Sequence, residues 1–258
     1  MRKMGDTIAE TDLLKDAKSL IDRAAERSIA LRLVGGLAIR MLTPELPPRS
    51  RTGQDLDFAS SSSTRRALSG LLTELGYNPD KNFNALYGNK QLYFAHGDTG
   101  LAIDVLIDKL HMCHTLEFAD RLGRMPYTLD AADLLMSKLQ IVELNEKDAD
   151  DCLRLLVTFR LEESSDPDTI DLRVFRSLVG DDWGWWRTVT LNLERINGLL
   201  YSGARPAIEG GRLDPGAQLQ TLIAAAQSAP KSRRWKLRAR IGERKRWYEV
   251  PEETPHHH

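Results

Sequence analysis

The sequence predicts an α+β fold, with a small mixed-sheet domain over residues 1–128 followed by a helical domain over residues 129–255. Before residue 128, helical periods alternate with short strand-like runs, whereas from Asp130 onward nearly every segment has apolar residues at helical spacing. The length of 258 residues and the apolar fraction of 41% suffice for a catalytic-sized domain with a helical companion. The change in pattern near residue 128 is therefore the expected domain boundary.

The first domain is expected to begin with a helix, because apolar residues recur at helical spacing after Asp6 or Thr7, either of which can serve as the cap. A short apolar run then predicts a buried strand, and Gly35-Gly36 leads into a brief helix. In order, the expected elements are helix 7–28, strand 29–34, a helix ending at Met41, loop 43–54, strand 55–59, helix 61–76 and strands 85–88, 91–95 and 101–106.

The second domain is expected to be helical throughout. The predicted helices are 130–144, 146–160, 168–179, 184–200 and 215–228. The tryptophans at 183, 185 and 186 fit best as core or interdomain anchors, although a base-stacking platform is the alternative. The final residues 256–258 are three histidines that resemble a tag remnant, so they are set aside.

Composition excludes several classes of protein. The net charge of −1 gives no global attraction to nucleic acid, and no apolar run approaches the roughly 20 residues that cross a bilayer. The N-terminus becomes acidic before any apolar stretch, so no signal peptide is expected. Cys113 and Cys152 are far apart and fit free thiols in a reducing compartment, which predicts a cytoplasmic protein without a membrane partner.

Three acidic residues carry the chemistry. Residues i and i+2 of a strand point to one face, so Asp55 and Asp57 should project side by side. Two adjacent carboxylates repel unless cations lie between them, and hard oxygen ligands suit Mg²⁺. Asp104 is the lone acid in an apolar strand and is the expected third ligand, with Asp108 as an alternative where that strand ends. The competing interpretation is strand-edge acids in turns or surface ion pairs.

Gly35 and Gly36 precede a helix start, where glycines let backbone N–H groups approach a phosphate closely. A tight strand–helix turn would also use them. Arg51 and Thr52 come just before the acidic strand, where Arg51 can reach a triphosphate or brace the loop.

The run from Val34-Gly35-Gly36 through Arg51-Thr52 to Asp55-Leu56-Asp57 resembles the signature of minimal nucleotidyltransferases of the polymerase-β-like superfamily. It is most similar to the branch that contains the AbiEii and MenT toxins of type IV toxin–antitoxin systems. A looser similarity continues over residues 134–140 and 147–151, and in all it spans residues 30–195.

This resemblance implies a Mg²⁺-dependent enzyme that transfers a nucleoside monophosphate from a nucleoside triphosphate (NTP) to an acceptor. It implies that Asp55 and Asp57 bind two Mg²⁺ ions and that Asp104 binds one of them and activates the attacking group. It also implies that the tRNA 3′ end is the acceptor and that a cognate antitoxin is a partner. Transfer to a small molecule or a protein hydroxyl, or a catalytically silent nucleotide-binding module, are the alternatives.

The same resemblance implies that Lys138 contacts the nucleotide's phosphates and that Asp148 or Asp151 is the family's later acid. The alternative for Lys138 is a solvated residue of an amphipathic helix. For the two acids it is a charge cluster at a helix N-terminus, where the helix dipole favours them.

Residues 231–247 hold nine positive charges and one acid. Such a run is typical of contact with nucleic-acid phosphates, with a tryptophan available to stack on a base. The alternative is a solvated basic helix. The expected nucleic-acid-binding residues are Arg233, Arg234, Trp235, Lys236, Arg238 and Arg240.

Overall fold

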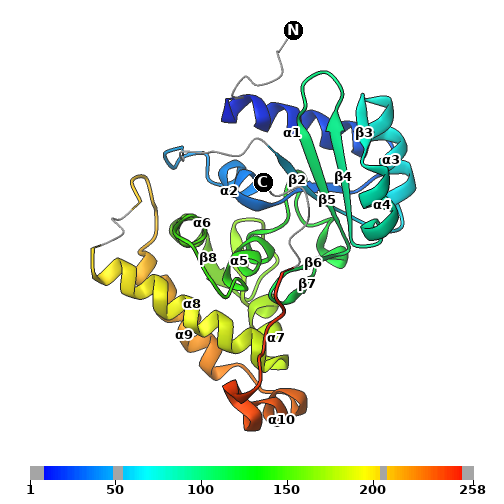
Figure 1. The fold of residues 1–258 in the computed structure, drawn as a ribbon. Coiled ribbons are helices and arrows are strands. Elements are labelled where there is room, and N and C mark those ends of the chain that lie inside the picture. Colours follow the sequence, from blue (N-terminus) through cyan, green and yellow to red (C-terminus); the bar gives the residue numbers. More distant parts are fainter. Residues whose placement is uncertain (1–8, 49–54, 204–207, 252–258) are drawn as a thin grey trace. The chain divides into compact units, whose positions relative to one another are not determined.

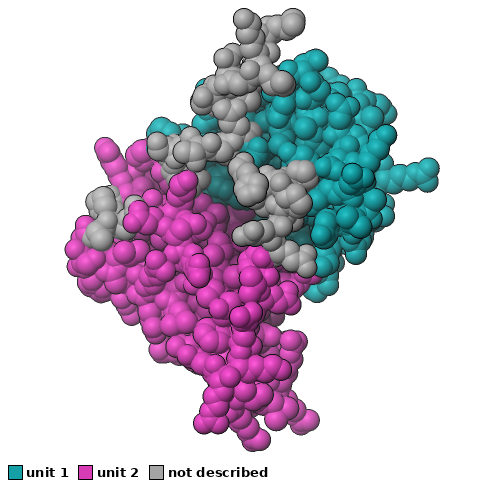
Figure 2. Space-filling model, viewed as in Figure 1, with its two compact units in different colours: residues 1–42, 48–110, 117–130 teal, residues 43–47, 111–116, 131–258 magenta. Residues whose placement is uncertain are grey.

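The protein has an α+β fold, as predicted, with a five-stranded mixed sheet and a separate group of helices (Figure 1). The computed structural model describes residues 9–48, 55–203 and 208–251. The chain forms two compact units (Figure 2): unit 1 comprises residues 1–42, 48–110 and 117–130, and unit 2 comprises residues 43–47, 111–116 and 131–258. No helix in the described part of the chain is long and apolar enough to cross a membrane.

Unit 1 is built on the five-stranded sheet, whose strand order is β1-β2-β5-β4-β3. The strands are β1 (Leu31–Leu33), β2 (Leu56–Ser60), β3 (Tyr77–Pro79), β4 (Gln91–His96) and β5 (Ala102–Ile107). Only β2 and β5 run parallel, and the other neighbours are antiparallel. One face of the sheet is apolar and almost fully buried, with Phe58, Phe94, Ile103 and Val105 among its residues. The opposite face of β2, β4 and β5 carries polar side chains.

Five helical segments accompany this sheet: α1 (Glu10–Ala25), α2 (Gly35–Leu42), α3 (Arg65–Glu74), α4 (Lys81–Tyr87) and the 3₁₀ turn η1 (Ala119–Arg121). In α1 the buried residues Leu13, Ala17, Leu20, Ile21 and Ala24 recur at helical spacing, and α1 packs against β1. The predicted helices around residues 7–28, 35–41 and 61–76 are therefore confirmed.

The predicted strand 85–88 is wrong, because most of it lies in α4. Asp80 caps this helix by accepting a hydrogen bond from the Phe83 N–H at 2.9 Å, and the Phe83 ring is buried. The strand before it, β3, was not expected. It starts after Gly76, whose φ of +87° turns the chain out of α3, and it pairs with β4.

Unit 2 is mainly helical, with α5 (Ala131–Leu139), α6 (Glu146–Thr158), α7 (Leu172–Asp181), α8 (Trp183–Tyr201), α9 (Pro215–Ser228), α10 (Arg233–Ile241) and the 3₁₀ turn η2 (Gly242–Arg244). Side-chain caps start five of these helices, at Asn145, Asp171, Asp182, Asp214 and Ser232. Two small sheets were not predicted: β6 (Lys109–His111) with β7 (Thr115–Glu117), and β8 (Arg160–Glu162) with β9 (Thr169–Asp171).

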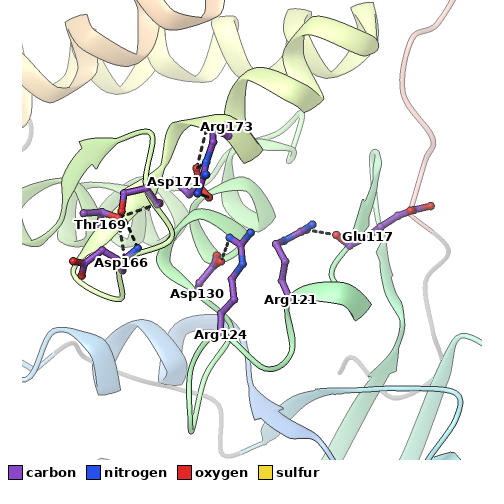
Figure 3. Close-up of polar contacts among 9 residues, drawn as sticks. Glu117, Arg121, Arg124, Asp130, Asp166, Thr169, Asp171 and Arg173 are labelled. Atoms are coloured by element: carbon purple, nitrogen blue, oxygen red, sulfur yellow. Dashed lines mark hydrogen bonds and ion pairs between the residues drawn. The ribbon is translucent and has the colours of Figure 1, made fainter.

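The predicted helix 168–179 begins later than expected, because its first residues form β9. Asp171 ends this strand and caps α7, accepting from the backbone N–H and from the guanidinium of Arg173, each at 2.9 Å (Figure 3). Thr169 donates to the Asp166 carbonyl at 2.9 Å and so closes the preceding turn. Both contacts are made by side chains, so the helical spacing of apolar residues does not predict them.

Two arginine side chains form polar contacts within the last segment of unit 1, residues 117–130. Arg124 forms an ion pair with Asp130 at 2.8 Å, and Arg121 donates to the Glu117 carbonyl (Figure 3). Leu33 in β1 binds this segment through two backbone bonds, accepting from the Leu129 N–H and donating to the Tyr127 carbonyl. Thr128 thereby forms an isolated parallel bridge with Leu33 at the edge of the sheet.

Candidate functional site

Asp57 and Asp104 occupy directly opposite positions on neighbouring strands. Asp57 lies in β2 and Asp104 in β5, and the two are register partners in the parallel pair. Register partners point to the same face, and neighbouring strands are about 4.8 Å apart. Asp57 is half-buried and Asp104 is buried. Their carboxyl groups therefore share one small area on the polar face of the sheet.

Asp55 lies immediately before β2, two residues from Asp57, and is exposed. Residues i and i+2 of a strand share a face, so Asp55 is expected on the same side as Asp57. Burial raises the pKa of Tyr93, and the negative charges of Asp55 and then Asp104 raise it further. Tyr93 is the register partner of Asp104 on β4, so the phenol lies beside the carboxylates. The position of Tyr93 beside these acids was not anticipated from the sequence.

The turn before α2 approaches Asp57 closely. Gly35 has φ of +68°, and a Cβ on it would lie 3.0 Å from Oδ2 of Asp57. The Val34 N–H donates to the Asp57 carbonyl at 2.8 Å and fixes this approach. Gly35 and Gly36 form the first turn of α2, whose N–H groups have no partners within the helix. The N-terminus of α2, which favours anions, therefore lies at the Asp57 carboxylate.

Gln91 holds the Asp104 carboxylate by a short hydrogen bond. Its Nε2 donates to Oδ1 of Asp104 at 2.5 Å, reaching diagonally across from β4. A neutral donor orients a carboxylate without cancelling its charge, as the outer partners of metal ligands do. Sequence reasoning missed Gln91, because nothing in the order of residues tells which side chains of β4 face Asp104.

Asp108, the alternative third acid, makes contacts that join neighbouring loops. It follows the end of β5 in a left-handed conformation with φ of +61°, which Asp tolerates better than most residues. Its Oδ1 accepts from the Ser62 N–H at 3.0 Å, and its carbonyl accepts from Phe118 and Ala119. Asp108 therefore ties loops together beyond the strand, whereas Asp104 lies beside Asp57.

The carboxylates fit a magnesium ion in their chemistry. Within the described residues, no group of three or more His, Cys, Asp and Glu side chains is arranged to hold a metal by itself. Mg²⁺ does not need such a cage, because it is usually held by one or two carboxylates together with substrate phosphates and water. Asp57 and Asp104 supply those oxygens, and the turn at Gly35 leaves open the space that a Cβ would fill.

Lys138, in α5 of unit 2, lies between the two acids of α6 that the sequence singles out. Its Nζ is 2.7 Å from Oδ1 of Asp148 and 3.2 Å from Oδ2 of Asp151. Burial alone would lower the pKa of Lys138, but the charges of Asp151 and Asp148 outweigh it and the pKa is raised. These contacts join α5 to α6. A role for the three residues toward nucleotide stays a prediction.

The remaining candidate residues lie as follows in the structure. Arg51 and Thr52 lie outside the described residues. Trp183 and Trp185 are buried in unit 2, and Trp186 is half-buried beside them. Cys113 and Cys152 are buried free thiols. His114 stacks on Trp185 with centroids 5.0 Å apart, and burial lowers its pKa to about 4.

The basic run at residues 231–247 folds in unit 2 as α10, η2 and a C-terminal stretch. Arg233, Arg234, Lys236 and Arg240 are exposed on α10, whereas Trp235 and Arg238 are half-buried. The run is thus a folded basic helix.

No protein-family model and no curated protein matches the chain. Among solved structures it is similar to the antibiotic-resistance factor ANT(2″)-Ia, at 12% identity and a TM-score of 0.42, over 76% of this chain and 99% of that one. It is similar to the lincomycin-bound lincosamide antibiotic adenylyltransferase LnuA, at 15% identity and a TM-score of 0.39, over 55% of this chain and 94% of that one. An antigenic nucleotidyltransferase-like protein from Paracoccidioides brasiliensis aligns at 10% identity and a TM-score of 0.41, over 85% of this chain and 94% of that one. With TM-scores below 0.5, these similarities do not identify an activity or an acceptor.

Proposed function

We propose that the protein is a Mg²⁺-dependent nucleotidyltransferase that moves a nucleoside monophosphate from an NTP to an acceptor hydroxyl. The observation that carries the proposal is the in-register pair Asp57 and Asp104 beside the N-terminus of α2. The pair of carboxylates is suited to bind the metal ion, and the helix N-terminus is suited to bind the triphosphate.

Each residue has a defined task in this proposal. Asp55, Asp57 and Asp104 hold the metal ions, and Gly35 and Gly36 present backbone N–H groups to a phosphate. Bound Mg²⁺ supplies charge neutralisation for the triphosphate and the departing pyrophosphate. The acceptor oxygen bonds to the α-phosphorus as the bond to pyrophosphate breaks, and the carboxylate of Asp104 takes the hydroxyl proton. Gln91 keeps that carboxylate oriented.

The acceptor that we propose to test first is RNA. The motif resembles that of a toxin branch acting on the tRNA 3′ end, and unit 2 carries an exposed basic helix. A toxin role with an antitoxin partner belongs to the same proposal. Small molecules and protein hydroxyls are the competing acceptors, because the same chemistry serves any hydroxyl group placed in line.

The test is incubation of the protein with each α-³²P-labelled NTP, Mg²⁺ and total tRNA, beside Asp57→Asn and Asp104→Asn variants. Label on tRNA that is lost in both variants supports the transfer chemistry and the RNA acceptor. Label on the protein itself supports the chemistry and excludes RNA as the main acceptor. The absence of label with all four NTPs and with Mn²⁺, tRNA and antibiotic acceptors supplied would overturn the proposal and favour a silent nucleotide-binding module.

A further inference from the structure

The basic C-terminal segment is anchored in unit 2 by its aromatic side chains. Trp235 of α10 packs edge-to-face on Trp186 of α8, with ring centroids 5.4 Å apart. Trp247 packs in the same way on Trp183 at 6.0 Å and donates its indole N–H to Thr188 at 3.0 Å. These indoles contact one another and the helix beneath. They therefore serve to hold α10 in place, and base stacking is not their main task.

Some of the basic residues also serve the fold. Lys231 donates to the Ala226 carbonyl at 2.7 Å and lies over the Trp235 ring at 5.2 Å. The Arg238 guanidinium lies 4.8 Å from the Trp183 ring and donates to the carbonyls of Gly242 and Lys245 at 2.7 and 2.6 Å. Arg234 pairs with Asp182 at 3.1 Å. Lys231 thereby closes the C-terminal end of α9, and Arg234 and Arg238 brace α10.

The remaining positive charges point outward from one side of α10. Arg233, Lys236 and Arg240 are three or four residues apart, so they lie along one face of the helix, and all three are exposed. None of them forms an ion pair with a carboxylate within the described chain. α10 itself contains no acid. Leu237 and Ile241 are exposed beside them, at 61% and 45% of full exposure. The exposed cations continue into residues 244–246.

We propose that this outward face of α10 (Arg233, Lys236 and Arg240), together with residues 244–246, binds the phosphate backbone of a nucleic acid. Cations that have no carboxylate partner among the described residues attract a polyanion along this helix face, and release of its counterions drives the binding. Because the tryptophans are engaged in packing, the contact recognises the charge of the phosphates and does not distinguish between bases. The proposal does not depend on nucleotide transfer, since no residue of the candidate active site takes part.

The experiment measures fluorescence anisotropy of a labelled 20-nucleotide RNA and of the DNA of the same sequence, without NTP or metal, between 50 and 300 mM NaCl. The test variant is Arg233→Gln/Lys236→Gln/Arg240→Gln. The control variant removes the same charge from exposed residues of unit 1, as Arg23→Gln/Arg66→Gln/Lys81→Gln. Circular dichroism melts establish that both variants are folded.

The test variant is expected to bind at least tenfold more weakly, with the slope of log K against log salt reduced by about 2–3. The control variant is expected to bind within twofold of the wild type. Equal losses on RNA and DNA support a backbone contact common to both, and loss on one alone supports that polymer as the ligand. Unchanged binding by the test variant, equal weakening in the control, or failure of the wild type to bind either polymer would each overturn the proposal. The last outcome would favour an acidic protein as the partner.

Discussion

Asp57 of β2 and Asp104 of β5 face each other in register on adjacent parallel strands. A parallel pair in the centre of a sheet normally brings apolar side chains together, as Phe58 and Val105 do one position further along. Two carboxylates at such positions repel each other and destabilise the fold unless a cation reduces the repulsion. A cation bound at this pair should therefore stabilise the fold measurably.

Asp57→Asn should lose most of the rise in melting temperature that Mg²⁺ with an NTP gives the wild type, because the substitution removes a metal-ligating oxygen and nearly keeps the shape. An increase of a few degrees corresponds to about 1 kcal/mol. Adding Mg²⁺ with an NTP should stabilise the wild type but have little effect on the variant. Differential scanning fluorimetry measures this shift in both proteins, and an equal shift in the variant would argue against a metal site at this pair.

Gly35→Ala should destabilise unit 1 by about 1–2 kcal/mol, because Ala is sterically disfavoured in the left-handed region and its Cβ crowds Oδ2 of Asp57. Gly70→Ala is the matched control. Gly70 lies in α3, where an added Cβ would meet no atom within 4 Å, so the change should stabilise by up to about 1 kcal/mol. Urea titrations compare the two variants, and equal effects would contradict the close approach at Gly35.

Gln91→Ala should weaken Mn²⁺ binding about 10-fold or more in the presence of NTP, because Asp104 loses the donor that orients it. The melting temperature should change little, since Gln91 is only half-buried. Titration calorimetry gives the metal affinity. A large loss of stability with unchanged affinity would show that Gln91 is merely a packing residue.

Lys138→Met should destabilise the protein by about 3–5 kcal/mol, because the buried carboxylate of Asp151 loses its ammonium partner. Lys138→Met/Asp148→Asn/Asp151→Leu should recover most of that loss, since the charges are removed together. Lys81→Met, at an exposed site, serves as the control. NTP binding gives a second measurement. If Lys138 contacts the nucleotide's phosphates, as predicted, the folded triple variant binds NTP more weakly than the wild type.

His114 should make the protein less stable in mild acid. Its pKa is lowered from 6.5 to about 4 in the folded state, mainly by burial, so the unfolded chain takes up the proton first as the pH falls. The contribution is present above pH 6.5 and is lost toward pH 4, and is on the order of 3 kcal/mol. His114→Asn should flatten this part of the stability–pH curve. An unaltered slope in His114→Asn would contradict burial of a neutral imidazole.

The periodic spacing of apolar residues was sufficient to predict the long helices. The helices at α1, α6, α8 and α9 follow regular apolar spacing, and α9 matches its predicted bounds of 215–228. Where capping side chains or pairing decided the outcome, periodicity was misleading. The run at 85–88 has the aromatic and aliphatic content of a strand, but Asp80 starts a helix ahead of it.

The candidate site was likewise predictable from the sequence only in part. The alternation around Asp55 and Asp57, and the lone acid Asp104 in an apolar run, indicated two strands. Their parallel register, which brings Asp57 opposite Asp104, depends on pairing across the sheet and has no local signal. Gln91 and Tyr93 depend on the same pairing, so they could not have been named. The basic run was evident, but the division of its charges between packing and surface required the tryptophan contacts of α10.

The central claim is that Asp57 and Asp104 hold a metal–nucleotide complex, and its most direct test is Mn²⁺ binding followed by electron paramagnetic resonance. The wild type, Asp57→Asn and Asp104→Asn are titrated with Mn²⁺ in the presence of a non-hydrolysable ATP analogue, with Asp108→Asn as the control. Both site variants are expected to weaken Mn²⁺ binding at least tenfold, whereas Asp108→Asn is expected to bind like the wild type. Equal affinity in all four proteins would contradict the claim.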